Sequence, residues 1–314
     1  MIILDEDFTG ISFVESSGAD LASSVREAKA QITGDLAEHG AVLMRGCATA
    51  QPEDFQKALI ELDFSPMAYT ERSTPRSMVA DGVFTSTDYP AREAIPQHCE
   101  SSYSNVWPGR LAFFCATRPA EAGATPIADV AAVARDLDER LLADLTEGGL
   151  MYVRNYGNGI GLDWRTAFQA DDQAAVERYC AANGLEWEWL PGDCLRTTRC
   201  AAPLSAHPRT GVPIWFNHLV LFHQSALGRE VREGLIDMFG EDRLPNDVRR
   251  ADGSAIPDLV VNAVRAVIDR HTRRFGWHAG DLLVIDNMRW SHGREPYTAP
   301  RRILVSMSDP CTGS

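Results

Sequence analysis

The chain is nearly without lysine and carries no surplus of positive charge. Of its 314 residues only two are lysine, at positions 29 and 57, against 28 arginines, and the formal net charge is −14. Proteins that bind nucleic acid through its phosphates need clustered cationic side chains. We therefore expect no nucleic-acid partner.

Three other features are missing. The seven cysteines form no CxxC pair, no run of 18 apolar residues occurs, and neither GxGxxG nor GxxxxGK[ST] is present. The first residues, Met-Ile-Ile-Leu-Asp-Glu-Asp, contain neither a basic segment nor a long apolar one. We therefore expect reduced thiols, no membrane span, no glycine-rich phosphate loop, no secretory leader and a cytoplasmic location.

Apolar periodicity predicts strands near both ends of the chain and helices between them. Helices are expected at 21–39, 52–62, 130–147, 171–183, 219–239 and 257–274. Strands are expected at 41–46, 83–87, 111–116, 282–286 and 303–307. This order favours a mainly β fold with flanking helices (α+β), built on one antiparallel core, over regular βαβ units.

Two short segments far apart in the sequence carry residues suited to a metal site. The first is Gln97-His98-Cys99-Glu100, where His98 and Glu100 are two apart and would share one face of a strand. The second holds His292, which follows the strand at 282–286 and is expected in a Ser-His-Gly turn. Two imidazoles and one carboxylate suit non-haem Fe(II) with coordination positions left open. Each piece alone is also compatible with a chance triplet or a hydrogen-bonded loop histidine.

These segments lie in a longer series of motifs that resembles a known family. The series includes Thr85-Ser86-Thr87-Asp88-Tyr89-Pro90, Pro96 to Ser104, Gly123 to Asp129, Tyr152 to Tyr156, His207 to Gly211, Trp215-Phe216-Asn217 and Asp286 to Arg302. In this order the chain, over about residues 40 to 308, resembles the TauD/TfdA family of Fe(II)/2-oxoglutarate-dependent dioxygenases. Within that family it is similar to the SyrP-type hydroxylases of peptide natural-product pathways.

The resemblance implies an architecture and a set of site residues. It implies a single domain over 1–314 with a double-stranded β-helix (jelly roll) core, in which 151–275 forms an insertion, lid and substrate-pocket region. His98, Glu100 and His292 would bind Fe(II). Arg302, with Arg301 as the fallback if the register differs by one, and Thr125 would bind the distal carboxylate of 2-oxoglutarate, because a guanidinium and a hydroxyl both hydrogen-bond a carboxylate.

Two departures from the family pattern narrow the reaction. The carboxylate ligand is Glu100, where many relatives have Asp and related halogenases have a small residue, so oxygen insertion or desaturation is favoured over halogenation. The taurine-specific enzymes carry an arginine fifteen residues after the second histidine, and that position is Met307 here. Taurine is therefore not the expected substrate. Tyr103, Asn217 and Arg154 are weaker candidates for substrate contacts.

The expected activity is oxidation of an unactivated C–H bond, with O2 as co-substrate and release of succinate and CO2. The substrate would be an amino acid or a small molecule derived from one, free or tethered to a carrier protein, and hydroxylation is the expected outcome. Desaturation or cyclisation by the same cofactors is an alternative. A zinc-dependent hydrolase with the same three ligands and a non-catalytic binding protein are alternatives from other classes.

Overall fold

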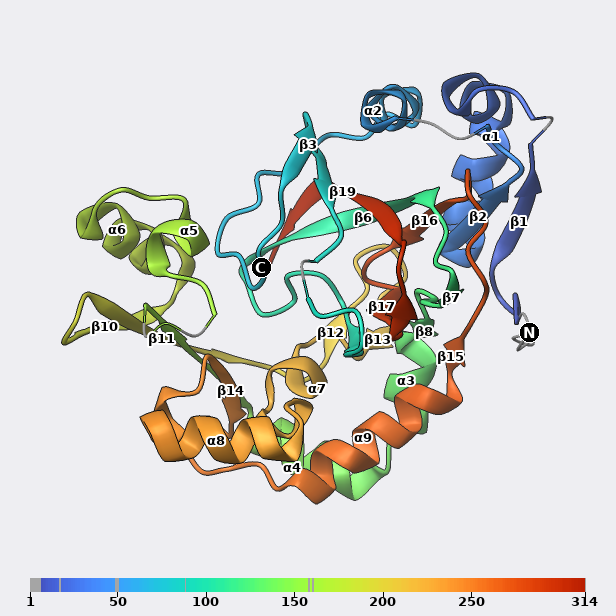
Figure 1. Cartoon of the computed structure of the whole chain (residues 1–314). Coiled ribbons are helices and arrows are strands. Elements are labelled where there is room, and N and C mark those ends of the chain that lie inside the picture. The colour runs from blue at the N-terminus through green and yellow to red at the C-terminus, as the bar shows by residue number, and fades with distance from the viewer. Residues whose placement is uncertain are drawn as a thin grey trace.

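Two β-sheets face each other at the centre of the computed structural model (Figure 1). The structure describes residues 7–16, 18–48, 51–87, 89–157, 159 and 161–313, so Asp88 and the first six residues, which entered the expectations above, lie outside the described residues. The larger sheet has the order β1 (Ser12–Glu15), β2 (Ala41–Arg45), β16 (Leu282–Asp286), β6 (Val106–Thr117), β19 (Arg302–Thr312), β4 (Val83–Thr85) and β3 (Met78–Ala80). The smaller has the order β15 (Thr272–Arg273), β8 (Ile127–Asp129), β17 (Trp290–Arg294) and β5 (Ile95–His98).

The larger sheet is buried on both faces. Leu43 on β2 and Leu283 on β16 pack toward the smaller sheet, against Ile127 and Trp290. Side chains one residue along each strand point the other way, because direction alternates in a strand. That second face packs on helices α1 (Leu21–His39) and α2 (Pro52–Glu61). Both faces being covered explains why these strands read as continuous apolar runs in the sequence.

A second group of elements adjoins this core. Its sheet has the order β10 (Glu186–Leu190), β11 (Cys194–Ala201), β9 (Leu150–Tyr156) and β14 (Asn246–Arg249). Its helices are α3 (Val130–Asp136), α4 (Glu139–Gly148), α5 (Trp164–Phe168), α6 (Gln173–Asn183), α7 (Leu219–Phe222), α8 (Arg229–Phe239) and α9 (Asp258–Arg270), with the 3-10 turns η1 (Gln224–Ala226) and η2 (Glu241–Arg243). The short pairs β12 (Ser205–Ala206) with β13 (Pro213–Ile214), and β7 (Glu121–Ala122) with β18 (Tyr297–Thr298), complete the described strands.

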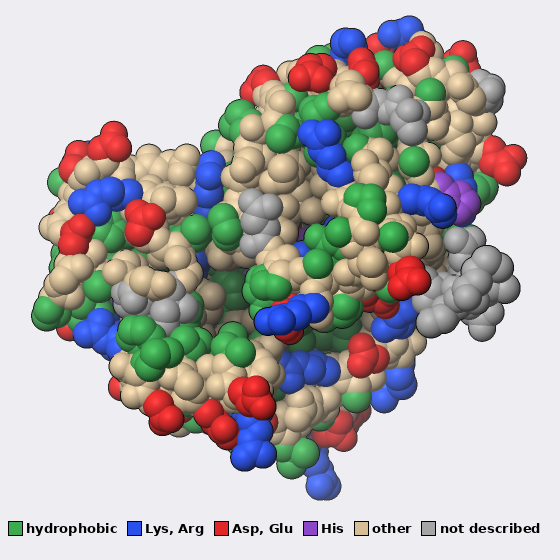
Figure 2. Space-filling model, in the orientation of Figure 1, with side chains coloured by type: hydrophobic (Ala, Val, Ile, Leu, Met, Phe, Trp, Pro, Cys, Tyr) green, Lys and Arg blue, Asp and Glu red, His purple; other side chains and the backbone are tan. Residues whose placement is uncertain are grey.

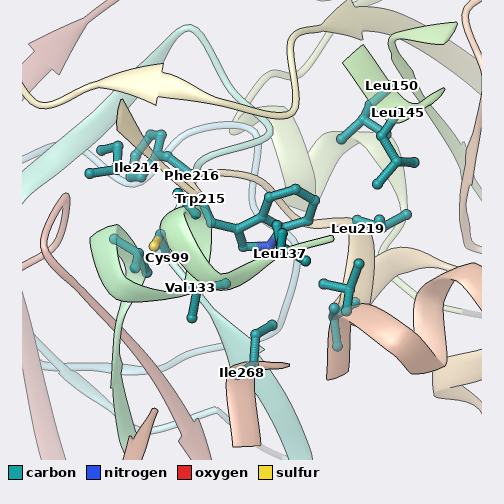
Figure 3. Packing of buried hydrophobic residues seen from close by; sticks show 14 of the residues in the cluster. Cys99, Val133, Leu137, Leu145, Leu150, Ile214, Trp215, Phe216, Leu219 and Ile268 are labelled. Carbon is teal, nitrogen blue, oxygen red and sulfur yellow. The ribbon is translucent and has the colours of Figure 1, made fainter. Parts of the chain in front are cut away.

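One apolar cluster joins this second group to the core (Figure 3). Trp215 and Val133 pack there beside Cys99, the residue between the two candidate ligands of the first motif. Ile268 of α9 reaches the same cluster from below in this view. The packing of the Cys99 side chain in this cluster therefore fixes the backbone there. It thereby helps to position the flanking residues His98 and Glu100.

Most elements agree with those predicted from the sequence, and two long helices do not. The helix expected at 130–147 is two helices, because Asp138 accepts hydrogen bonds from the amides of Arg140 and Leu141 and starts α4 afresh. The helix expected at 219–239 is divided into α7, η1 and α8. There the His223 side chain accepts from the Ser225 amide and caps the short η1 turn.

In the described part of the chain, no helix is long and apolar enough to cross a membrane.

Candidate metal and co-substrate site

His98 and His292 lie directly opposite each other across two antiparallel strands. They are register partners of β5 and β17, and their rings are 4.3 Å apart between centroids. The pairing becomes irregular between His292 and Arg294. Gly293 allows this close approach, because a Cβ there would lie 2.8 Å from the carbonyl oxygen of Ile95. His292 is thus a strand residue, and the turn expected around it is wrong.

Glu100 reaches the same place from a turn. β5 ends at His98, so the expectation that His98 and Glu100 share a strand face is wrong. The chain reverses after Glu100, where Ser101 has φ of 55°. The Asn287 side chain holds this turn: its Oδ1 accepts from the Glu100 amide at 2.7 Å, and its Nδ2 donates to the Glu100 carbonyl at 3.0 Å and to the Pro108 carbonyl at 2.8 Å.

The three candidate ligands form a compact, buried set. One ligand atom from each of His98, Glu100 and His292 lies within 4.8 Å of the others, and Nε2 of His292 is 3.7 Å from Oε2 of Glu100. The Nδ1 atom of His98 hydrogen-bonds the Pro96 carbonyl at 2.8 Å, which leaves Nε2 to face the other ligands. Two imidazole nitrogens and one carboxylate oxygen are the donor set that suits Fe(II).

Burial keeps both histidines in the form that binds a metal. Burial lowers the pKa of His98, and burial followed by the nearby His98 ring lowers the pKa of His292 well below its usual value. Both rings are therefore neutral at neutral pH and offer a lone pair. The residues present thus fit the metal by donor type, burial and protonation.

A buried arginine that the sequence did not reveal contacts the carboxylate ligand. Nη2 of Arg76 donates to Oε2 of Glu100 at 2.8 Å, and the two side chains are 5% and 3% exposed. Nη1 of Arg76 lies 3.9 Å from the sulfur of Met307 on β19. Nothing in the sequence near position 76 marks this role, because its partner is 24 residues away in a separate turn.

Arg301, the fallback choice, occupies the place expected for Arg302. Nη2 of Arg301 donates to Oγ1 of Thr125 at 3.2 Å, and Nε donates to the Gly123 carbonyl at 3.0 Å. Burial, and the nearby Arg294 guanidinium, lower the pKa of Arg301 to about 10. Arg302 is exposed and begins β19. Adjacent residues of an extended chain point to opposite sides, so only one of the two arginines can face the interior.

Two cavities meet at His98, one of the candidate metal ligands. The smaller, of about 40 Å³, is bounded by Arg301, Thr125 and His292. The larger, of about 240 Å³, opens beside His98. The described residues that line the larger one are Ser73, Thr74, Pro75, Arg76, Thr87, Tyr89, Ala94, Ile95, Pro96, His98, Gly161, Leu221, Phe222, Ala226, Leu227 and Asn246. Arg76, Thr87, Ile95 and His98 belong to both walls.

The three weaker substrate candidates make internal contacts. The Tyr103 hydroxyl donates to the Glu71 carbonyl at 2.6 Å, and Arg154 pairs with the Glu71 carboxylate at 3.5 Å. Asn217 accepts from the Leu219 amide and donates to a backbone carbonyl. The described lining of the larger cavity includes none of the three candidates. Their contacts fit bracing of the fold.

The two facing sheets and the buried set of two histidines and one carboxylate place this protein in the class of non-haem iron oxygenases. The family described as taurine catabolism dioxygenase TauD, TfdA family, matches residues 5–307. The chain belongs to this family, and it is a 2-oxoglutarate-dependent non-haem iron dioxygenase whose cofactors are Fe(II), 2-oxoglutarate and O2. The family match confirms the jelly-roll α+β fold class predicted from the sequence.

Individual proteins are similar to this chain over nearly its whole length. The chain is 36% identical to dapdiamide synthesis protein DdaC of Enterobacter agglomerans over 96% of this chain and 91% of that protein. It is 28% identical to a clavaminate synthase-like protein of Arabidopsis thaliana, over 90% of this chain and 86% of the other. The solved structure of PvcB from Pseudomonas aeruginosa is similar in fold, with a TM-score of 0.54, 15% identity, and coverage of 94% and 84%.

On the face of the molecule shown in Figure 2, acidic and basic side chains are interspersed. This face therefore carries no dominant charge of one sign.

Proposed function

We propose that this enzyme hydroxylates an unactivated C–H bond of an amino acid or an amino-acid-derived small molecule in a biosynthetic pathway. The carrying observation is the buried set His98, Glu100 and His292, which adjoins both a guanidinium–hydroxyl pair and a separate, mostly apolar cavity. The relative DdaC, by its name, takes part in dapdiamide synthesis. That relationship supports a small-molecule biosynthetic substrate.

Arg301 and Thr125 are proposed to hold the distal carboxylate of 2-oxoglutarate. They hydrogen-bond each other at 3.2 Å in the smaller cavity, where a guanidinium fork and a hydroxyl can both donate to one carboxylate. The Thr125 hydroxyl also accepts from Nε1 of Trp277 at 3.1 Å, which directs its own proton elsewhere. That proton is then free to be donated to the carboxylate. We assign this role to Arg301, and Arg302 does not take part.

His98, Glu100 and His292 would hold the iron, which with 2-oxoglutarate and O2 supplies the oxidising power when bound. The protein's own contribution is placement and exclusion of water. Pro96 orients the His98 ring through Nδ1, and Asn287 fixes the Glu100 turn. The substrate carbon to be oxidised is proposed to lie at the His98 end of the larger cavity, within reach of the ligand set.

The segment 151–275 is proposed to shape the substrate cavity. Leu221, Phe222, Ala226 and Leu227 from α7, η1 and the residue after it line that cavity, as does Asn246 of β14. Desaturation or cyclisation would use the same metal and co-substrate and differ in the fate of the substrate radical. A zinc hydrolase would leave Arg301 and Thr125 without a role, so we do not favour it.

The proposal can be tested by anaerobic titration of the metal-free protein with Fe(II) and then 2-oxoglutarate, recording the weak visible absorption of the chelate. We expect the band in the wild type and in His278→Ala, which changes an exposed histidine outside the triad. We expect no band in His292→Ala. A full band in His292→Ala, or metal binding without a band in the wild type, would contradict the assignment. Incubation with free and carrier-linked amino acids and detection of succinate then identifies the substrate.

A further inference from the structure

The Arg76 guanidinium is buried, and one of its three nitrogens, Nε, has no hydrogen-bond acceptor among the described residues. Its side chain is 5% exposed, and within the described part of the chain its hydrogen-bond partners are Oε2 of Glu100 and the sulfur of Met307. A buried donor without an acceptor is unfavourable, so such a group normally has a hydrogen-bond partner, which here a bound molecule can supply.

The position of Arg76 indicates what could satisfy it. Arg76 lies in the wall shared by the two cavities, and among the described residues that line the larger one it is the only side chain with a formal charge. The rest of that lining is dominated by apolar groups such as Ile95, Phe222 and Leu227. A ligand with one anionic end and an apolar body matches this combination.

The charge balance of the loaded site points the same way. With a divalent iron and a doubly charged 2-oxoglutarate in place, the positive charges of the metal and of the lining arginines Arg76, Arg294 and Arg301 exceed the negative charges of Glu100 and the co-substrate by two. An uncompensated charge in a buried site is costly, and a carboxylate that pairs with it is stabilised. A carboxylate also fits the planar fork of a guanidinium.

We infer that Arg76 binds a carboxylate of the substrate, so that the substrate is a free acid whose apolar part fills the cavity of about 240 Å³ beside His98. This inference rests on the proposed function and narrows it. A substrate joined to a carrier through a thioester has lost that carboxylate. The inference therefore favours free acids over substrates tethered through their only carboxyl group.

The test uses a matched pair of probes, 4-methylpentanoate and 4-methylpentanamide. Protein saturated anaerobically with Fe(II) and 2-oxoglutarate is titrated with each probe, and dissociation constants are measured by calorimetry and by the change in the chelate band. Saturation with 2-oxoglutarate keeps the probes away from Arg301. We expect the acid to bind at least about tenfold more tightly than the amide, as a charge-assisted hydrogen bond would give.

Arg76→Gln should remove this preference, leaving the two probes within about threefold of each other. Arg72→Gln is the matched control, because Arg72 donates to the Tyr69 carbonyl and is not among the described residues lining either cavity. It should keep the wild-type preference. Arg76→Lys keeps the charge without the fork and should give an intermediate preference.

Wild-type protein that binds the acid no more tightly than the amide would overturn the inference, and so would an unchanged preference in Arg76→Gln. If Arg76→Gln fails to bind iron, Arg76→Lys decides: a reduced preference supports the inference and an unchanged one overturns it. Failure of the proposed function is seen separately, because the chelate band would then be missing from the wild type before any probe is added.

Discussion

The two sides of the cavity of about 240 Å³ beside His98 are built in different ways. On one side, His98 and His292 are register partners in a sheet that packs against a second sheet, and Asn287 fixes the turn of Glu100 with three hydrogen bonds. On the other side, α7 and η1 line the cavity, and the next helix, α8, has no buried residue along its described length. Strand register thus fixes the positions of the candidate ligands on one side, whereas short helices form the wall on the opposite side.

This difference indicates where substitutions can be tolerated. A shift of one residue in β5 or β17 would turn a ligand away from the metal, so the metal side permits little change. Substitutions among the helical residues alter the shape of the cavity without moving a ligand. We expect changes in substrate preference to arise mainly on the helical side.

The largest contrast should appear in stability. Phe114 on β6 is fully buried and stacks on Phe55 of α2, with centroids 5.5 Å apart, whereas Met238 of α8 is 69% exposed. We expect Phe114→Ala to lower the free energy of unfolding by about 3–5 kcal/mol and Met238→Ala to change it by less than about 0.5 kcal/mol. Urea denaturation followed by circular dichroism measures both. Similar losses for the two variants would show that α8 is packed as tightly as the sheet.

Substitutions of the two neighbouring arginines should affect 2-oxoglutarate binding very differently. Arg301→Gln removes the guanidinium beside Thr125, and we expect the dissociation constant for 2-oxoglutarate to rise about 100-fold. Arg302→Gln changes an exposed residue and should shift that constant by less than about threefold. Anaerobic titration of the chelate band gives both values. The reverse pattern would return the role to Arg302.

The smallest expected effect is on the pH dependence of stability. Burial lowers the pKa of His98, His218 and His292 in the folded chain, while an unfolded histidine titrates near 6.5. The stability that each contributes is complete above pH 6.5 and is lost as the pH falls below it, because the unfolded chain then binds protons that the folded chain does not.

For the metal-free protein, each such histidine should add a slope of about 1.4 kcal/mol per pH unit below pH 6.5. His218→Gln should reduce the slope by about that amount, because it removes one buried histidine. Denaturant melts between pH 5 and 7 provide the measurement. Equal slopes in His218→Gln and the wild type would mean that His218 binds a proton in the folded state.

Much of the fold and of the metal site could be predicted from the sequence, and the failures share a physical cause. Helix α1 and strand β16 have the predicted bounds, because local periodicity and flanking glycines determine them. The choice between Arg301 and Arg302 depended on how the chain enters β19. Arg76 could not be found, because its partner is a side chain brought near only by the folded chain.

The Asn287 side chain supports the Glu100 turn from a position far along the chain, so the two parts of the site are synthesised at different times. It lies 187 residues after Glu100, to which it is hydrogen-bonded, and it sits in the connection between β16 and β17, ahead of His292. During synthesis, the residues of the first motif leave the ribosome long before this amide does. A chain that is still being made, or one cut before residue 287, therefore has neither the third ligand nor the support for the carboxylate. The three candidate ligands are therefore all present only in a chain that has been synthesised beyond residue 292.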